Sequence, residues 1–103
     1  MHEWITLTQV FGSSLRNPTM AEMETALDEL FEKADADHPD AWIECGTESG
    51  PLYCISIFSN GYALYTKYSD SDMSEVLESK RLSPVDRQGA LALWSNLTQG
   101  RTP

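Results

Sequence analysis

Residues 52–68, LYCISIFSNGYALYTKY, decide the fold that we expect for this chain. Two runs rich in β-branched and aromatic residues, Leu52–Phe58 and Tyr62–Tyr68, are typical of strands, and they flank the dipeptide Asn60-Gly61. Asn and Gly both tolerate the positive φ that the central positions of a type I′ turn require. The stretch therefore predicts an antiparallel hairpin closed by a two-residue loop.

A two-residue loop sets the expected register of this hairpin, with Ser59 opposite Tyr62 and Ile57 opposite Leu64. Side chains alternate between the two faces of a strand, so the register also sorts them. The face expected beneath a helix carries Tyr53, Ile55, Ile57, Leu64, Thr66 and Tyr68. The other face carries Leu52, Cys54, Ser56, Phe58, Ala63, Tyr65 and Lys67. We expect another element to cover this mixed second face in part; the alternative is that a partner binds it.

Further strands are predicted at residues 3–10 and 41–45, and residues 76–82 are a weak candidate for an edge strand. A first amphipathic helix is predicted to begin at Asn17-Pro18 and to end near residues 35–40. A capping box formed by Thr19 and Glu22 is an alternative start, one step later. The expected apolar stripe of this first helix consists of Met20, Met23, Leu27, Leu30, Phe31 and Ala34.

A second helix is predicted from Ser83, as its cap, to about Leu97, with Gly100 as an end signal. Its expected buried stripe consists of Ala90, Leu93, Trp94 and Leu97. We therefore expect one α+β domain over residues 1–103. It has an antiparallel sheet of about four strands with two helices packed on it, in the order β-α-β-β-β-(β)-α.

The charge of the chain is strongly acidic and unevenly distributed. Sixteen acidic and seven basic side chains give a net charge of −9. Residues 1–50 carry eleven of the acids and only two of the bases. Such a chain is repelled by phosphate backbones and anionic lipids, which argues against direct nucleic-acid or membrane binding, whereas a basic protein partner is attracted. The alternative is that the charge serves solubility alone.

The N-terminal residues and the apolar runs predict a cytoplasmic protein. No apolar run approaches the ~20 residues that cross a bilayer. Met1-His2-Glu3-Trp4 lacks the basic region and apolar stretch of a signal peptide.

Candidate catalytic residues are few. A dyad of His38 with Cys45 or Cys54 is conceivable, but His38 lies in an acidic link that is more typical of a solvated helix end. Without a Cys-x-x-Cys motif we expect both cysteines to stay reduced. We therefore predict that the protein is not an enzyme.

The same acidic link, which holds Asp35, Asp37, His38 and Asp40, is also a weak candidate for a metal site. A calcium loop needs a glycine and a final bidentate carboxylate in register, and a zinc site needs two more strong ligands. We therefore expect neither a metal nor a cofactor.

Aromatic and acidic side chains in and after the hairpin predict a partner-binding surface. Aromatic anchors within an electrostatic rim are typical of interface hot spots. The residues predicted to form this surface are Trp42, Tyr65, Asp70, Asp72, Glu75 and Glu78. The alternative is that the aromatic residues belong to the core and the acids to a solvated loop. The acids of the first helix form a second candidate surface: Glu24, Asp28, Glu29 and Glu32.

The order of elements between Met20 and Leu97 resembles that of a known family. The resemblance rests on the first helix, Trp42-Ile43, Ser49-Gly50-Pro51-Leu52, the strand through Ile57, Asn60-Gly61, residues 63–68 and the last helix. On these features the chain resembles small immunity proteins encoded beside bacterial polymorphic toxins. It is nearest to the first numbered immunity family, some members of which neutralise deaminase toxins.

The resemblance implies a cytoplasmic, non-catalytic protein that binds one cognate toxin domain and occludes its active site or substrate groove. The implied partner is a basic domain that acts on nucleic acid, such as a deaminase or a nuclease. A small acidic adaptor or regulatory module that self-associates through its sheet is the alternative function, since Leu52, Phe58 and Tyr65 are expected on the exposed side of the sheet.

Overall fold

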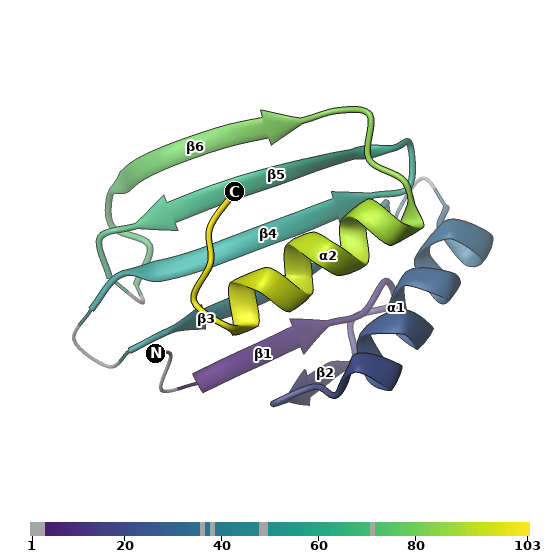
Figure 1. Cartoon of the computed structure of the whole chain (residues 1–103), viewed down its shortest axis with the longest axis horizontal. Helices are drawn as coiled ribbons and strands as arrows, with labels where there is room; N and C mark the ends of the chain where they lie inside the picture. Colours follow the sequence, from purple (N-terminus) through teal and green to yellow (C-terminus); the bar gives the residue numbers. More distant parts are fainter. Residues whose placement is uncertain (1–3, 36, 38, 48–49, 71) are drawn as a thin grey trace.

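The computed structural model describes residues 4–35, 37, 39–47, 50–70 and 72–103. Six strands form one antiparallel sheet, in the spatial order β2-β1-β3-β4-β5-β6 (Figure 1). The strands are β1 (Trp4–Thr8), β2 (Ser14–Arg16), β3 (Asp40–Gly46), β4 (Leu52–Phe58), β5 (Tyr62–Tyr68) and β6 (Val76–Leu82).

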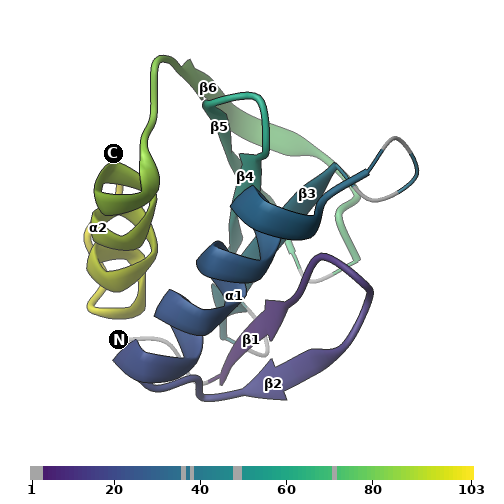
Figure 2. The same cartoon turned by 90° about the vertical axis from the view of Figure 1, so that its right-hand side faces the viewer.

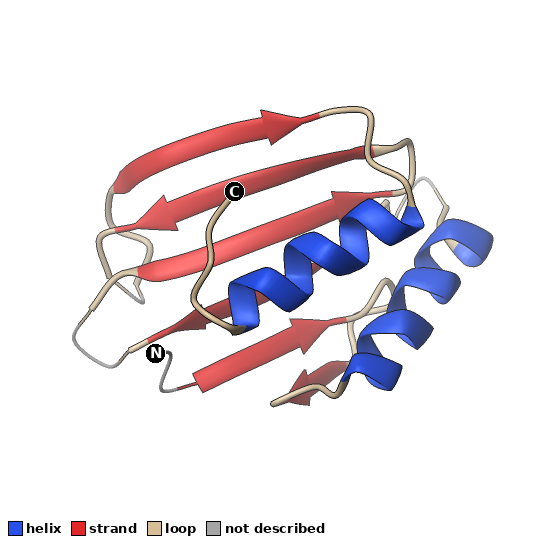
Figure 3. Cartoon of the chain, in the orientation of Figure 1, coloured by secondary structure: helices blue, strands red, loops and turns tan. Residues whose placement is uncertain are grey.

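Two helices, α1 (Met20–Lys33) and α2 (Arg87–Thr98), pack against one face of this sheet. The edge-on view places both helices on the same side of the strands (Figure 2), and the blue helices lie in front of the red sheet in Figure 3. The predicted α+β class with two helices on an antiparallel sheet is confirmed. The predicted number of about four strands is wrong, because the weak edge strand is formed as β6 and a further strand, β2, is present.

The hydrophobic core fills the space between the helices and the sheet. Both helices bury apolar stripes there, as expected, although Met20 is 47% exposed and lies outside the core. The indole of Trp94 donates a hydrogen bond to the carbonyl oxygen of Ile55 at 3.1 Å, which fixes α2 on β4. The fully buried side chains include Leu7, Leu27, Leu30, Ile43, Ile55, Ile57, Trp94 and Leu97.

The register predicted for the β4–β5 hairpin is wrong by one residue. Phe58 lies opposite Tyr62, and Ile57 lies opposite Ala63. Gly61 has a positive φ of 94° but Asn60 does not, and the amide of Gly61 donates to the carbonyl oxygen of Phe58 at 3.1 Å. The loop therefore contains three residues with glycine in the left-handed position, a common alternative to the type I′ turn.

This shift moves every side chain of β5 to the opposite face. Tyr53, Ile55 and Ile57 lie on the helix side, as expected. The β5 residues that pair with them on the helix side are ones that we expected on the other face: Ala63, Tyr65 and Lys67. The residues that were expected beneath a helix lie instead on the side without helices: Leu64, Thr66 and Tyr68.

Both predicted helix starts also differ from the structure, because backbone hydrogen bonds tie the preceding residues to the sheet and to the hairpin loop. The amide of Asn17 donates to the carbonyl oxygen of Ile5 at 2.8 Å and continues the pairing of β2 with β1, so the alternative capping box of Thr19 begins α1. The amide of Val85 donates to Gly61 at 2.7 Å, and α2 therefore begins at the cap Asp86 rather than at Ser83.

Candidate binding face of the sheet

The side of the sheet opposite α1 and α2 is covered by no described helix (Figure 2). We call this side the open face. Strand alternation and the pairing register assign its side chains. They are Trp4, Thr6, Thr8, Ser14, Arg16, Asp40, Trp42, Glu44, Leu52, Cys54, Ser56, Phe58, Tyr62, Leu64, Thr66, Tyr68, Ser79 and Arg81.

The open face is rich in aromatic side chains. It carries five of the ten aromatic residues of the chain, and each of the five is half-buried among its neighbours. The five are Trp4, Trp42, Phe58, Tyr62 and Tyr68. The rings of Phe58 and Tyr62 stack at 4.3 Å with an interplanar angle of 11°. We expected another element to cover part of this side of the sheet. Only single positions of it, Leu52 and Thr66, are buried.

Carboxylates lie among these rings. Asp40 and Glu44 flank Trp42 on the same face of β3, because side chains two residues apart point the same way. The indole of Trp42 donates to Oε1 of Glu44 at 2.6 Å, which holds the ring in place. Burial raises the pKa of the Asp40 carboxyl above its usual value, although a backbone hydrogen bond partly offsets the effect.

The open face already holds one guanidinium group on an aromatic ring. Arg81 of β6 lies over the ring of Tyr62 at 4.6 Å from its centroid, within the range of a cation–π interaction. Tyr62 therefore holds a planar cation in the conformation that it has here.

The acidic connection between β5 and β6 lies at one end of the open face. Oδ1 of Asp70 accepts hydrogen bonds from the amides of Asp72 at 3.1 Å and Ser74 at 3.3 Å, so this carboxylate orders the loop. The side chains of Asp72 and Glu75 are exposed. Negative charge thus reaches the end of the face that is opposite to Asp40.

The six residues predicted to bind a partner do not form one patch. Trp42 lies on the open face, and Asp70, Asp72 and Glu75 lie at its end. Tyr65 lies on the helix side, is 2% exposed and donates from its hydroxyl to Oε2 of Glu78 at 3.1 Å. Tyr65 therefore belongs to the core, and it lies on the opposite side of the sheet from Trp42.

Trp4, Phe58, Tyr62 and Tyr68 are not among the six residues predicted to bind a partner, although Phe58 was expected on the face that a partner could bind. Their alternation with core residues is visible in the sequence, but it becomes informative only with the correct register. The second candidate surface, on α1, also lies away from the open face. There Asp28 already binds the guanidinium of Arg87.

The two cysteines lie on opposite faces of neighbouring strands. Cys45 is buried on the helix side and Cys54 lies on the open face, and both are free thiols. Burial raises the pKa of each thiol to about 12, so neither is a ready nucleophile near neutral pH. His38, the other member of the conceivable dyad, lies outside the described residues. Within the described part of the chain, no three His, Cys, Asp or Glu side chains gather as a metal site would require.

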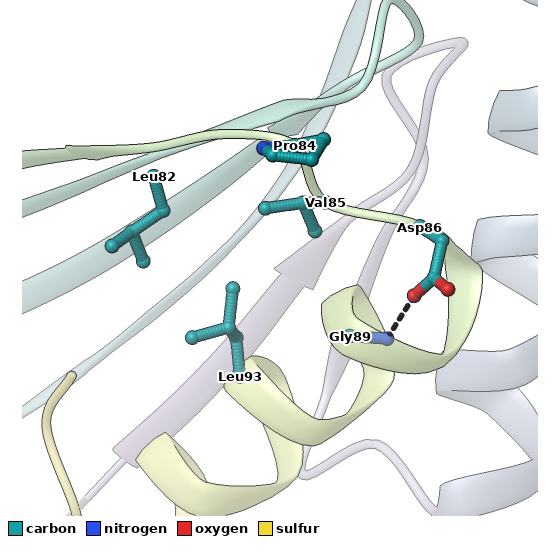
Figure 4. A pocket seen from close by; sticks show the side chains of 6 residues that line it. All are labelled: Leu82, Pro84, Val85, Asp86, Gly89 and Leu93. Carbon is teal, nitrogen blue, oxygen red and sulfur yellow. Dashed lines mark hydrogen bonds between the residues drawn. The ribbon is translucent and has the colours of Figure 1, made fainter.

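An apolar groove of about 400 Å³ lies between the end of β6 and the start of α2 (Figure 4). Leu82, Pro84, Val85 and Leu93 form most of its wall. Its carboxylate, Asp86, accepts a hydrogen bond from the amide of Gly89 at 2.7 Å and serves as the cap of α2. The groove therefore offers few polar groups to orient a ligand.

Comparison of the chain with models of protein families, with curated proteins and with solved structures finds no match. Neither described helix has the length and apolar character needed to cross a membrane. Any proposal for function therefore depends on the open face and on the resemblance seen in the sequence.

Proposed function

We propose that this chain is a stoichiometric binding protein that docks a basic protein domain on its open face and neutralises it. The observation that carries the proposal is a sheet covered by helices on one side only, with five aromatic rings, two carboxylates and the guanidinium groups of Arg16 and Arg81 on the other. Aromatic side chains with a charged rim supply most of the binding energy in many protein interfaces.

The open face by itself is smaller than a standard protein interface. Five strands spaced ~4.8 Å apart, each with about 3.3 Å per residue over some seven residues, make a face on the order of 500 Å². A standard interface takes about 800 Å² from each partner. The acidic ends of the face must therefore contribute, which favours a partner with basic groups around an apolar centre.

The charge of the chain supports the same partner. At −9, it speeds the approach of a basic domain and slows the approach of an acidic one. Domains that act on nucleic acid are basic around their sites, and the resemblance to immunity proteins makes a deaminase or nuclease toxin domain the proposed partner. In this proposal the carboxylates of the open face take the place of phosphates and occlude the substrate groove.

The test begins by reading the gene directly upstream of this chain, where the proposal expects a toxin-like domain. Coexpression is expected to relieve growth inhibition by that domain, and the purified pair is expected to form an equimolar complex. Asp72→Lys changes a carboxylate beside the open face, whereas Glu24→Lys makes the same charge change on exposed α1. We expect Asp72→Lys to lower the association rate by about tenfold at low salt, and Glu24→Lys to lower it much less.

Two results would overturn the proposal. If Glu24→Lys slows association more than Asp72→Lys, the partner binds α1 rather than the open face. If the gene neighbourhood encodes only metabolic enzymes and no basic domain binds, the function itself is wrong.

Self-association through the open face is the second candidate function, and the half-buried apolar side chains of Phe58 and Leu64 on that face favour it. The net charge of −9 on each chain opposes such pairing. Light scattering of the purified chain separates the two candidates, because a stable dimer that protects Trp42 from solvent would replace the proposed function by self-association.

A further inference from the structure

A hollow of about 320 Å³ lies where the turn after β1 meets the start of β3. Phe11 and Gly12 line it from the turn, and Asp37, Asp40 and Trp42 line it from the other side. Since Asp40 and Trp42 also belong to the open face, the hollow lies at the end of that face where β1 ends and β3 begins. These strand ends are at the right of Figure 1.

The walls of the hollow are held by hydrogen bonds. The amide of Gln9 donates to the carbonyl oxygen of Ser13 at 2.7 Å, and the amide of Gly12 donates to that of Gln9 at 2.9 Å. Gly12 has a positive φ of 93°, which allows this tight turn. On the opposite wall, the bond from Trp42 to Glu44 fixes the indole. The hollow is therefore preorganised.

Two aromatic rings and two carboxylates give the hollow its chemistry. Phe11 is 48% exposed, which is unusual for a large apolar side chain, and Trp42 is half-buried. No Lys or Arg in the described part of the chain forms an ion pair with Asp37 or Asp40. The desolvated carboxyl of Asp40 thus lines the same hollow as two rings, and no Lys or Arg among the described residues pairs with it.

We infer that this hollow binds an arginine side chain of the basic partner, between the rings of Phe11 and Trp42 and against the carboxylates of Asp37 and Asp40. A guanidinium group is planar, stacks on aromatic rings and pairs with carboxylates through two parallel hydrogen bonds. Arg81 on Tyr62 shows the same pairing of groups elsewhere on the open face. The volume is near the ~300 Å³ lower limit of ligand pockets, which suits one side chain better than a cofactor.

This inference rests on the proposed function for the identity of the partner, but it is testable without the partner. The probe is the peptide acetyl-Gly-Arg-Gly-amide, and the control peptide carries citrulline, which keeps the planar shape of arginine without its charge. We expect saturable NMR shifts at the indole N–H of Trp42 and at the amides of residues 9–12, with a millimolar Kd. The citrulline peptide is expected to bind about tenfold more weakly, since it loses the charge-assisted bonds.

Variants locate the site. Asp40→Asn and Phe11→Ala are each expected to weaken binding of the arginine peptide by about fivefold. Asp72→Asn removes the same charge at the other end of the open face and is expected to leave binding unchanged. Equal shifts with the citrulline peptide, or equal losses with Asp72→Asn and Asp40→Asn, would overturn the inference.

Two outcomes distinguish a failure of the arginine site from a failure of the proposed function. If a basic domain binds the open face and its affinity is unchanged by Asp40→Asn and Phe11→Ala, the arginine site is wrong and the function stands. If the arginine peptide binds as expected while basic domains do not, the site stands and the proposed function is wrong.

Discussion

The register of the β4–β5 hairpin gives the sharpest test of the structure, because two registers that differ by one residue exchange the roles of Leu64 and Tyr65. The three-residue loop buries Tyr65, which is 2% exposed, and leaves Leu64 half-buried on the open face. A two-residue loop would do the reverse. Alanine at each of the two positions therefore distinguishes the registers.

The expected losses differ severalfold. Truncating a fully buried aromatic residue costs about 3–5 kcal/mol, so we expect Tyr65→Ala to lower the free energy of unfolding by about 4 kcal/mol. Leu64→Ala removes a half-buried side chain and is expected to cost about 1 kcal/mol. Because a small domain has about 5–15 kcal/mol in total, Tyr65→Ala is close to the limit of what the fold tolerates.

Urea unfolding followed by circular dichroism measures both values. With an m-value of about 2 kcal/mol per molar urea, the midpoint falls by about 2 M for Tyr65→Ala and by about 0.5 M for Leu64→Ala. Tyr65→Phe separates the ring from its hydroxyl, whose hydrogen bond to exposed Glu78 is expected to contribute about 1 kcal/mol. A larger loss from Leu64→Ala than from Tyr65→Ala would refute the register, and with it the assignment of β5 side chains to the open face.

Three further outcomes follow from single contacts. Thr19→Ala removes the capping box of α1 and is expected to lower the free energy of unfolding by about 1 kcal/mol, measured by the same urea titration. Burial raises the pKa of Tyr65 from 10.0 to about 12, so the unfolded chain ionises first and stability falls as pH rises through this interval. Tyr65→Phe should remove the loss of stability that ionisation of Tyr65 causes in this pH interval. If the stability of the variant falls with pH as that of the original chain does, this assignment is wrong. Cys45 and Cys54 are expected to resist alkylation by iodoacetamide near neutral pH until the chain unfolds, because their pKa values are about 12. Rapid labelling of either thiol in the folded protein would show that the burial of this thiol is wrong.

Local patterns were sufficient to locate most of the elements. Leu52–Phe58 and Tyr62–Tyr68 form strands over the same bounds that the runs of β-branched and aromatic residues predict. The spacing of Met23, Leu27 and Leu30 places α1 correctly against the sheet. These signals depend on neighbours within a few residues, and period and composition capture such neighbours.

The partner-binding residues were harder to predict, because a face is a property of the whole sheet. Trp42 was predicted to bind a partner from its type and its place beside the hairpin, and it lies on the open face. Tyr65 was assigned to the surface by the wrong register. Phe58 was expected on the face that a partner could bind, but its stacking on Tyr62 was not. The hollow beside Phe11 joins a turn near residue 11 to a strand near residue 40, and no spacing along the chain indicates that contact.

The chain's own residues thus determined the strands, the helices, the α+β class and the acidic charge. Tertiary contacts decided the register, since the amide of Ser59 donates to Pro39 at 2.9 Å and the carbonyl of Gly61 accepts from Val85 at 2.7 Å. These bonds come from segments about twenty residues away on either side, and they hold the loop in its three-residue form. The open face depends on that choice, because a slip of one residue sends every β5 side chain to the other side of the sheet.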